Sequence, residues 1–328
     1  MTHARLAAVF LAVTTLSAQA ATAQHEQPET VTATDDLTGD EDTSAGIEVA
    51  GQPQHNGPSV TLRSSARLQF DADFHGEPGD FGVNRALLGV AVAGRINDAT
   101  SYSLDFEIEN SAYDFSGATT LVPGTEDPLD DALSFVFMPS FRVAIDDAWA
   151  IRAGGALIVS GETDANVSDS LRGSLFGGVE RRLSDRLTLS LLVVGWTRLE
   201  DDAQFFPLIG VSWQINDLMR LQTRGLGAEF ISDLGNGWSL GARAAYEYRE
   251  FRLSDDSSAP LPEGVLRDSG VVTSLELAWT QSPGVVFAIE GGGVFTQELE
   301  FLDRAGSTVS STNTNTALFI GVRASFAF

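Results

Sequence analysis

The sequence predicts an all-β protein: a single transmembrane antiparallel β-barrel of 14 strands, with 12 strands as the alternative. Three observations predict it. Long segments alternate apolar with polar or charged residues, short turns alternate with mostly longer polar loops, and tryptophans gather near the short turns. The barrel is expected over residues 59–328, after a signal peptide (1–23) and a disordered acidic tether (24–58).

Composition excludes several classes of protein. The 328-residue chain has 45 acidic residues against 20 basic ones, all arginine, and a net charge of −25. Nucleic acid is excluded as a partner, because phosphate binding needs a basic surface. The chain has no cysteine, so disulfides, thiolate metal sites and cysteine nucleophiles are excluded as well.

The first 58 residues divide into two segments. Arg5 precedes an apolar run from Leu6 to Leu16 and then small residues, as in a secretory signal peptide cleaved after Ala20 or Ala23. The run is too short for a membrane helix, which needs about 20 apolar residues. Residues 24–58 hold eight acids and no arginine, so they cannot bury enough apolar surface to offset their chain entropy.

Each expected strand has one apolar and one polar face, because side chains alternate sides along a strand. The clearest cover residues 60–74, 102–109, 133–145, 149–159, 238–249, 271–279, 285–296 and 317–328. Many hold 10 to 13 residues. Strands of soluble proteins usually have about 5 to 6 residues, and a tilted membrane crossing needs about 9 to 11. Pro139 predicts a bulge, since it cannot donate to a ladder.

Six short turns separate these strands: Asn97-Asp98-Ala99, Asp146-Asp147, Ser184-Asp185-Arg186, Asn216-Asp217, Gly235-Asn236-Gly237 and Ser282-Pro283-Gly284. They give seven hairpins, hence 14 strands with both termini on the periplasmic side. The hairpin of residues 218–234 has only 17 residues, and Gly225 and Gly227 mark its reversal. If it does not cross, the count is 12.

Aromatic residues on the apolar side are expected to form a belt at the periplasmic interface, where amphipathic rings are favoured. The belt consists of Tyr102, Trp149, Trp213, Trp238 and Trp279, each within a few residues of a short turn. Core tryptophans would not gather at one end of the strands.

The last strand carries a family resemblance. Residues 317–328 have apolar side chains at alternate positions and end in Phe326 and Phe328, which resembles the assembly signal of Gram-negative outer-membrane barrels. Residues 187–328 resemble a group of uncharacterised outer-membrane barrels, a domain of unknown function; the segments 182–189, 237–253 and 261–264 carry this likeness. The resemblance implies a bacterial outer-membrane location, with membrane lipids and the barrel-assembly machinery as partners. It implies no activity.

The charged side of the strands is expected to line the lumen. The residues assigned to it are Arg63, Arg67, Arg85, Arg95, Arg152, Arg172, Arg243, Arg249, Asp105, Glu107, Glu180, Glu276 and Glu290. One interpretation is an arginine ladder that guides anions. The favoured one is a set of ion pairs that brace a narrow lumen, because the charges nearly balance and a buried arginine needs a carboxylate.

The predicted function is a passive pore or small-solute channel, because a barrel of this strand number can leave luminal space. The alternative is a closed structural or surface-interaction barrel. No enzyme, catalytic residue, cofactor or metal site is assigned, since His75 is the one histidine that can reach the barrel rim. The acidic outer loops can attract divalent cations, although Glu126, Asp127, Asp130 and Asp131 lack a recognisable calcium-loop spacing.

Overall fold

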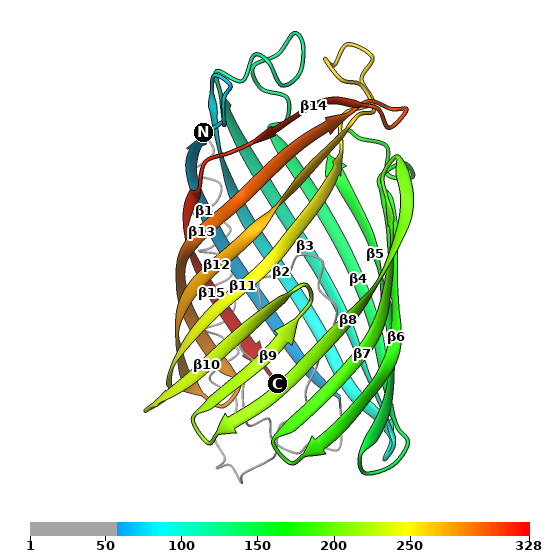
Figure 1. Cartoon of the computed structure of the whole chain (residues 1–328), viewed down its shortest axis with the longest axis vertical. Helices are drawn as coiled ribbons and strands as arrows, with labels where there is room; N and C mark the ends of the chain where they lie inside the picture. The colour runs from blue at the N-terminus through cyan, green and yellow to red at the C-terminus, as the bar shows by residue number, and fades with distance from the viewer. Residues whose placement is uncertain (1–57) are drawn as a thin grey trace.

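The computed structural model describes residues 58–328 and shows a tilted β-barrel (Figure 1). The predicted signal peptide and nearly all of the predicted tether lie outside these residues. No helix among the described residues is long and apolar enough to cross a bilayer. The strands are β1 (Ser59–Asp73), β2 (Asp80–Asn97), β3 (Thr100–Ser116), β4 (Asp131–Ala144), β5 (Trp149–Glu162), β6 (Leu171–Ser184), β7 (Leu187–Arg198), β8 (Asp201–Asn216), β9 (Met219–Arg224), β10 (Gly227–Gly235), β11 (Trp238–Arg252), β12 (Val265–Ser282), β13 (Val285–Leu302), β14 (Thr308–Asn313) and β15 (Ala317–Ala327).

The barrel closes as an antiparallel sheet in which neighbours in sequence are neighbours in space. β15 pairs with β13 on one side and with β1 on the other, where Thr61 lies opposite Ala327. The short β14 extends the same course and pairs with the upper part of β13, so β14 and β15 form one interrupted strand. This confirms the prediction of 14 strands.

The hairpin of residues 218–234 joins the sheet, but its two strands, β9 and β10, are short. β9 and β10 pair with each other and with β8 and β11, and they turn back at Arg224 and Gly227. The hairpin is too short for two full crossings, but both of its strands are paired within the closed sheet, so the count is 14 and not 12. The prediction of a bulge at Pro139 is wrong, because the register between β4 and β5 is the same on both sides of that residue.

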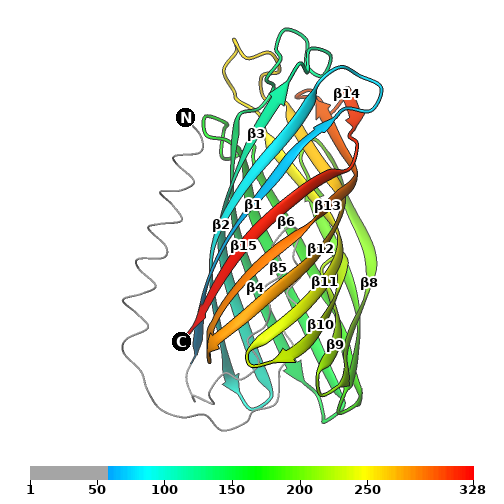
Figure 2. The same ribbon diagram turned by 90° about the vertical axis from the view of Figure 1, so that its left-hand side faces the viewer.

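All six predicted turns lie between consecutive strands, and they gather at one end of the barrel (Figure 2). The beginning of β1 and the end of the chain lie there too, since the Val60 N–H donates to the Phe328 carbonyl and the Ala327 N–H to that of Gly284. The turn at Gly235-Asn236-Gly237 has three positive φ angles (84°, 56° and 79°), a conformation that favours glycine and asparagine. We call this the short-turn end and the other the long-loop end.

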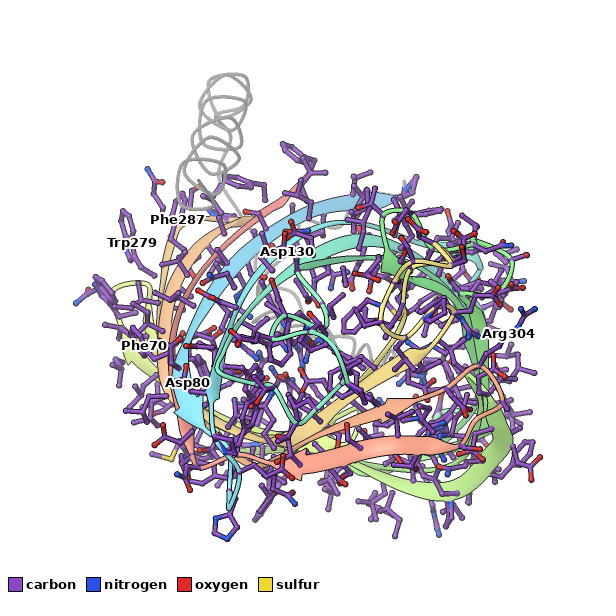
Figure 3. All side chains as sticks on the ribbon, turned by 90° about the horizontal axis from the view of Figure 1, so that it is seen from above. Phe70, Asp80, Asp130, Trp279, Phe287 and Arg304 are labelled. Atoms are coloured by element: carbon purple, nitrogen blue, oxygen red, sulfur yellow. The ribbon has the colours of Figure 1, made fainter. Side chains whose placement is uncertain are left out.

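The apolar sides of the strands face outward. Leu88 is 42% exposed, Leu275 62% and Ile289 59%, whereas Arg152 on an inner face is 2% exposed. Trp279 and Phe287 lie outside the ribbon in the view along the barrel (Figure 3). A soluble barrel would show the reverse, since its apolar faces pack inside. The exterior therefore suits hydrocarbon.

A bulge exchanges the two faces of β13. The ladder with β12 shifts by one residue between Ser269 and Val271, opposite Thr296, whose φ is 49°. Phe295 before the bulge is 41% exposed, but Leu299 and Phe301 beyond it are fully buried, although all three have odd numbers. A one-residue slip moves every later side chain to the other face.

Apolar side chains fill the inside of the barrel at the long-loop end. This apolar plug combines the ends of β2, β3, β11, β12 and β13 with the loop between β3 and β4; Phe81 packs on Phe115 with ring centroids 5.7 Å apart. Its members are Phe74, Phe81, Val83, Tyr113, Phe115, Ala118, Leu121, Val122, Leu129, Ala132, Phe251, Leu253, Leu266, Leu299 and Phe301. On β2 and β3 the charged lining expected from the sequence thus gives way to apolar side chains at this end.

Candidate luminal pathway

Ion pairs between neighbouring strands line the lower half of the lumen. The Arg63 guanidinium lies 2.6 Å from Asp105 and 3.1 Å from Glu107, and Arg152 lies 3.2 Å from Glu180. Each pair joins strands that are adjacent or next but one in the sheet. Such pairs neutralise the wall and leave the axis of the barrel free.

A second set of ion pairs crosses the lumen. Arg67 of β1 donates to Glu247 of β11 at 3.0 Å, and Arg249 of β11 donates to Glu109 of β3 at 3.2 Å. β11 and β3 are almost opposite each other in the ring of strands. Burial and the coupling of several charges make such contacts stronger than surface pairs, and here they bridge the interior.

A buried carboxylate continues this bridge toward the apolar plug. Asp268 of β12 accepts hydrogen bonds from Arg85 at 2.6 Å, the Tyr113 hydroxyl at 2.9 Å and Gln297 at 2.7 Å. Gln297 in turn accepts from Gln69 at 2.9 Å. The polar bridge and the apolar plug together narrow the interior between the β1–β3 and β11–β13 walls.

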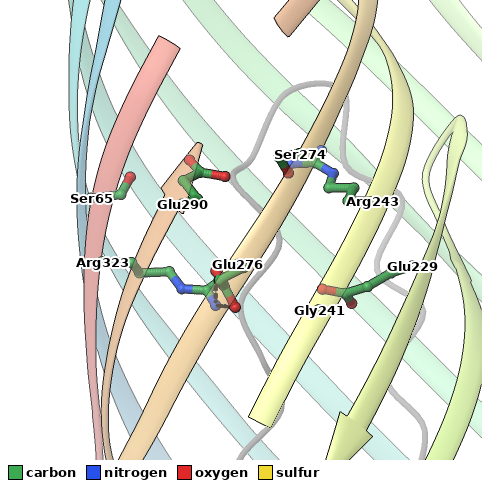
Figure 4. Close-up of a pocket in the computed structure, with 8 residues that line it drawn as sticks. All are labelled: Ser65, Glu229, Gly241, Arg243, Ser274, Glu276, Glu290 and Arg323. Atoms are coloured by element: carbon green, nitrogen blue, oxygen red, sulfur yellow. Dashed lines mark hydrogen bonds and ion pairs between the residues drawn. The ribbon is translucent and has the colours of Figure 1, made fainter. Parts of the chain in front are cut away.

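A small polar pocket remains below the bridge, three to five residues above the beginning of β11 (Figure 4). Its lining contains three carboxylates, of Glu229, Glu276 and Glu290, and two guanidinium groups, of Arg243 and Arg323. Arg323 lies 2.5 Å from Glu276. Ser65, Gly241 and Ser274 leave space between the charges. The pocket has room for about one water molecule among fixed charges of both signs.

The structure places the sequence-assigned luminal residues as follows. Arg63, Arg67, Arg85, Asp105, Glu107, Arg152, Glu180, Arg243, Arg249, Glu276 and Glu290 point inward, and they divide among the wall pairs, the bridge and the pocket. Arg172 lies higher, 3.5 Å from Glu250. Arg95 is exposed near the short-turn end of β2 and belongs to none of the three groups.

The five aromatic residues of the expected belt lie near the short-turn end. The four tryptophans are exposed, and the Trp238 and Trp279 rings stack across β11 and β12 with centroids 6.2 Å apart. Tyr102 is half-buried near the start of β3. In the last strand, Phe326 pairs with Val285 and Phe328 is 60% exposed.

Sequence reasoning missed a buried cluster around Glu250, at the long-loop end of β11. Its carboxylate is fully buried and lies 2.8 Å from Arg267, 3.5 Å from Arg172 and 3.7 Å from Arg198, and it also accepts from the Leu199 N–H. It has this environment because β11 leans inward here, so that Arg252 pairs with Gly161 of β5. The sequence does contain a signal for this cluster, because Glu250 and Arg252 fall on the apolar side of β11, where a lipid-facing strand carries no charge.

Carboxylates at the long-loop end have shifted pKa values. Burial, with repulsion from Asp130 and Asp114, raises the pKa of Asp127 above its ordinary value of 3.8. Hydrogen bonds donated by the Ser258 N–H and hydroxyl lower the pKa of Asp256 below the same value. Among residues 58–328, no three histidine, cysteine or acidic side chains gather as a metal site requires.

These two shifts have opposite consequences for stability. A carboxyl whose pKa is raised by folding stabilises the folded state at a pH below its pKa in the unfolded chain, and this contribution is lost as the pH rises. A carboxyl whose pKa is lowered by folding stabilises the folded state at higher pH, and this contribution is lost on acidification. At about pH 7, Asp127→Asn is therefore expected to raise the thermal unfolding midpoint slightly and Asp256→Asn to lower it slightly. Circular dichroism melts between about pH 7 and 2 should show both differences shrinking. Shifts of the same sign would contradict this assignment.

Comparison with known proteins gives matches by structure alone. No family model and no curated sequence matches the chain, so the expected membership of an uncharacterised barrel family stays a prediction. An outer membrane channel from Pseudomonas putida F1 is 10% identical, with a TM-score of 0.47 over 87% of this chain and 100% of that one. A Pseudomonas aeruginosa FadL homologue is 12% identical (TM-score 0.41; 82% and 89%), and the P. putida toluene transporter TodX 7% (0.42; 84% and 91%). These values assign no function to the chain.

Proposed function

We propose that this protein is an outer-membrane barrel that acts as a passive channel of low conductance for small solutes. The polar pocket inside a barrel with an apolar exterior carries the proposal, because an interior of fixed charges beside free space is what a selective pathway needs. The bridge above the pocket makes the pathway narrow, so conduction requires Arg67 and Arg249 to exchange carboxylate partners.

The orientation belongs to the same proposal. Short turns face the periplasm in bacterial barrels, so the short-turn end, with the aromatic belt and Phe328, is placed there. The partners are then outer-membrane lipids along the exterior and the barrel-assembly machinery at the last strand. The acidic long loops face outside and attract cations, divalent ones included.

Planar-bilayer recording tests the channel. The purified protein is expected to give small conductance steps, and Arg243→Glu to shift the reversal potential in a salt gradient toward cation preference, because it replaces a pocket cation by an anion. Arg304→Glu is the matched control, since Arg304 is exposed in a long loop. A membrane that stays sealed with folded protein present would overturn the proposal.

A second candidate is a closed structural or surface-interaction barrel. The bridge between β11 and the opposite wall favours it, together with the apolar plug above. It predicts no conductance, and binding of another envelope component that depends on residues 24–58 or on the loop within residues 110–132. The same bilayer recording separates the two candidates.

A further inference from the structure

The ladder between the strands that flank β9 and β10 is interrupted above that hairpin. β8 from Asp201 to Gly210 has ladder partners on β7 alone, because β9 ends at Arg224. β11 beyond Tyr246 pairs with β12, and its tip turns to β5, where the Ser160 hydroxyl donates to the Glu250 carbonyl. The two strands diverge above the hairpin (Figures 1 and 2). We call the interruption the β8–β11 gap.

The gap lies at the depth of hydrocarbon. Phe205 is eight residues above Trp213 of the aromatic belt, a rise of about 20 Å along a tilted strand, and the apolar band of such barrels is about 25 Å tall. Phe205 is 76% exposed, Ile209 67% and Tyr246 44%, so apolar surface borders the gap on both sides. At the hairpin tip, three strand spacings separate β8 from β11, about 14 Å.

The inner wall behind the gap is aromatic, and the Arg198 guanidinium borders it from above, donating to the Tyr248 hydroxyl at 3.1 Å. Trp196 packs edge-on against Phe206 with centroids 4.5 Å apart, and stacks on Tyr248 of β11 at 6.4 Å. The inner faces of β7 and β8 carry apolar residues around this trio, Leu192, Val194 and Leu208 among them. Lower in the lumen, ion pairs line the wall instead, so this aromatic surface suits an apolar ligand.

An unsatisfied donor lies within the aromatic wall. The Trp196 indole Nε1 is buried and has no hydrogen-bond partner among residues 58–328. Leaving such a donor unpaired costs about 1–3 kcal/mol. Trp196 lies at the level of Phe205, near the upper boundary of the apolar band, which is where the ester oxygens of lipids lie.

We propose that the β8–β11 gap binds one acyl chain of a membrane lipid, with the chain against Trp196, Phe206 and Tyr248 and an ester oxygen accepting from the indole N–H. Lipid is the chosen occupant because it is the medium at the opening. An added β-strand is disfavoured: Pro207 cannot donate to a new ladder, and Asp201 and Asp202 charge the upper part of the edge. The proposal goes beyond channel function and does not depend on it.

Fluorescence quenching tests the site. Replacing Trp149, Trp213, Trp238 and Trp279 by phenylalanine leaves Trp196 as the single tryptophan. In vesicles of phosphatidylcholine brominated high in its acyl chains, Trp196 emission is expected to fall at least twofold and to resist aqueous acrylamide. Quenching by acrylamide without quenching by brominated lipid would show a water-filled space and overturn the proposal. Quenching only by added brominated fatty acid would overturn the choice of lipid.

A pair of variants tests whether Trp196 is quenched by lipid inside the gap or by lipid outside the barrel wall. Leu208→Arg places a charge on the inner face of β8 beside the gap and is expected to abolish lipid quenching of Trp196. Ser212→Arg lies on the same face, where β9 covers the edge opposite Gln222, and is expected to leave it unchanged. Folding of both is checked by heat-modifiable gel migration. Equal lipid quenching in both folded variants would contradict a lipid seated in the gap.

Discussion

Replacing Glu250 by glutamine is expected to lower the free energy of unfolding by about 3–5 kcal/mol, because it removes a fully buried negative charge that faces three guanidinium groups. Arg172, Arg198 and Arg267 all lie within 3.7 Å of this fully buried carboxylate. Urea unfolding of the barrel in lipid vesicles, followed by tryptophan emission, measures the change.

Glu300→Gln is the matched control. Glu300 also contacts Arg267, at 3.1 Å, but its side chain is 26% exposed and Arg267 keeps Glu250 as a partner. Its loss is expected to cost less than about 1 kcal/mol. Similar losses for both variants would mean that the Glu250 cluster does not hold the inward lean of β11.

The second large effect concerns the direction of the apolar faces. Leu275 is 62% exposed in the middle of β12, four residues above Trp279 of the aromatic belt, and Leu275→Arg is expected to destabilise the barrel in lipid by about 2–4 kcal/mol, the cost of arginine near the bilayer midplane. The same urea titration in vesicles measures it. The physical reason is the loss of water around the guanidinium group.

Val167→Arg provides the comparison. Val167 is 67% exposed, like Leu275, but it lies in the loop between β5 and β6, outside the expected apolar band. The expected change there is near zero. If Leu275→Arg were equally harmless in a folded barrel, the exterior would not face hydrocarbon, and the membrane assignment would be wrong.

Local pattern predicted the parts of the fold that depend on neighbouring residues. Alternation fixes which side chains share a face, so the outward position of Leu275 and the inward position of Arg152 could be predicted from sequence. Turn composition predicted all six short turns, and the short segment between Asn216 and Gly235 predicted a hairpin that does not cross the full height of the barrel.

Contacts across the barrel could not be predicted in this way. Alternation states that Glu109 and Arg249 point inward, but their meeting depends on the positions of strands far apart in the sequence. The bulge at Thr296 also breaks the parity on which the assignment of faces rests, so Phe301 became part of an apolar plug that no periodic pattern indicates. The inward lean of β11 could be suspected from Glu250 alone, where charge interrupts an apolar side.

The ladder between β1 and β15 has a consequence for how the molecule assembles. It joins Thr61 to Ala327, the most distant pairing along the chain, whereas every hairpin forms from nearby residues. Loop-closure entropy makes such distant pairing the slow step, so the hairpins can form first and the ring seals last. Until sealing, the inward guanidinium and carboxylate groups remain hydrated, and the transverse contacts between Arg249 and Glu109 become available only to a completed cylinder.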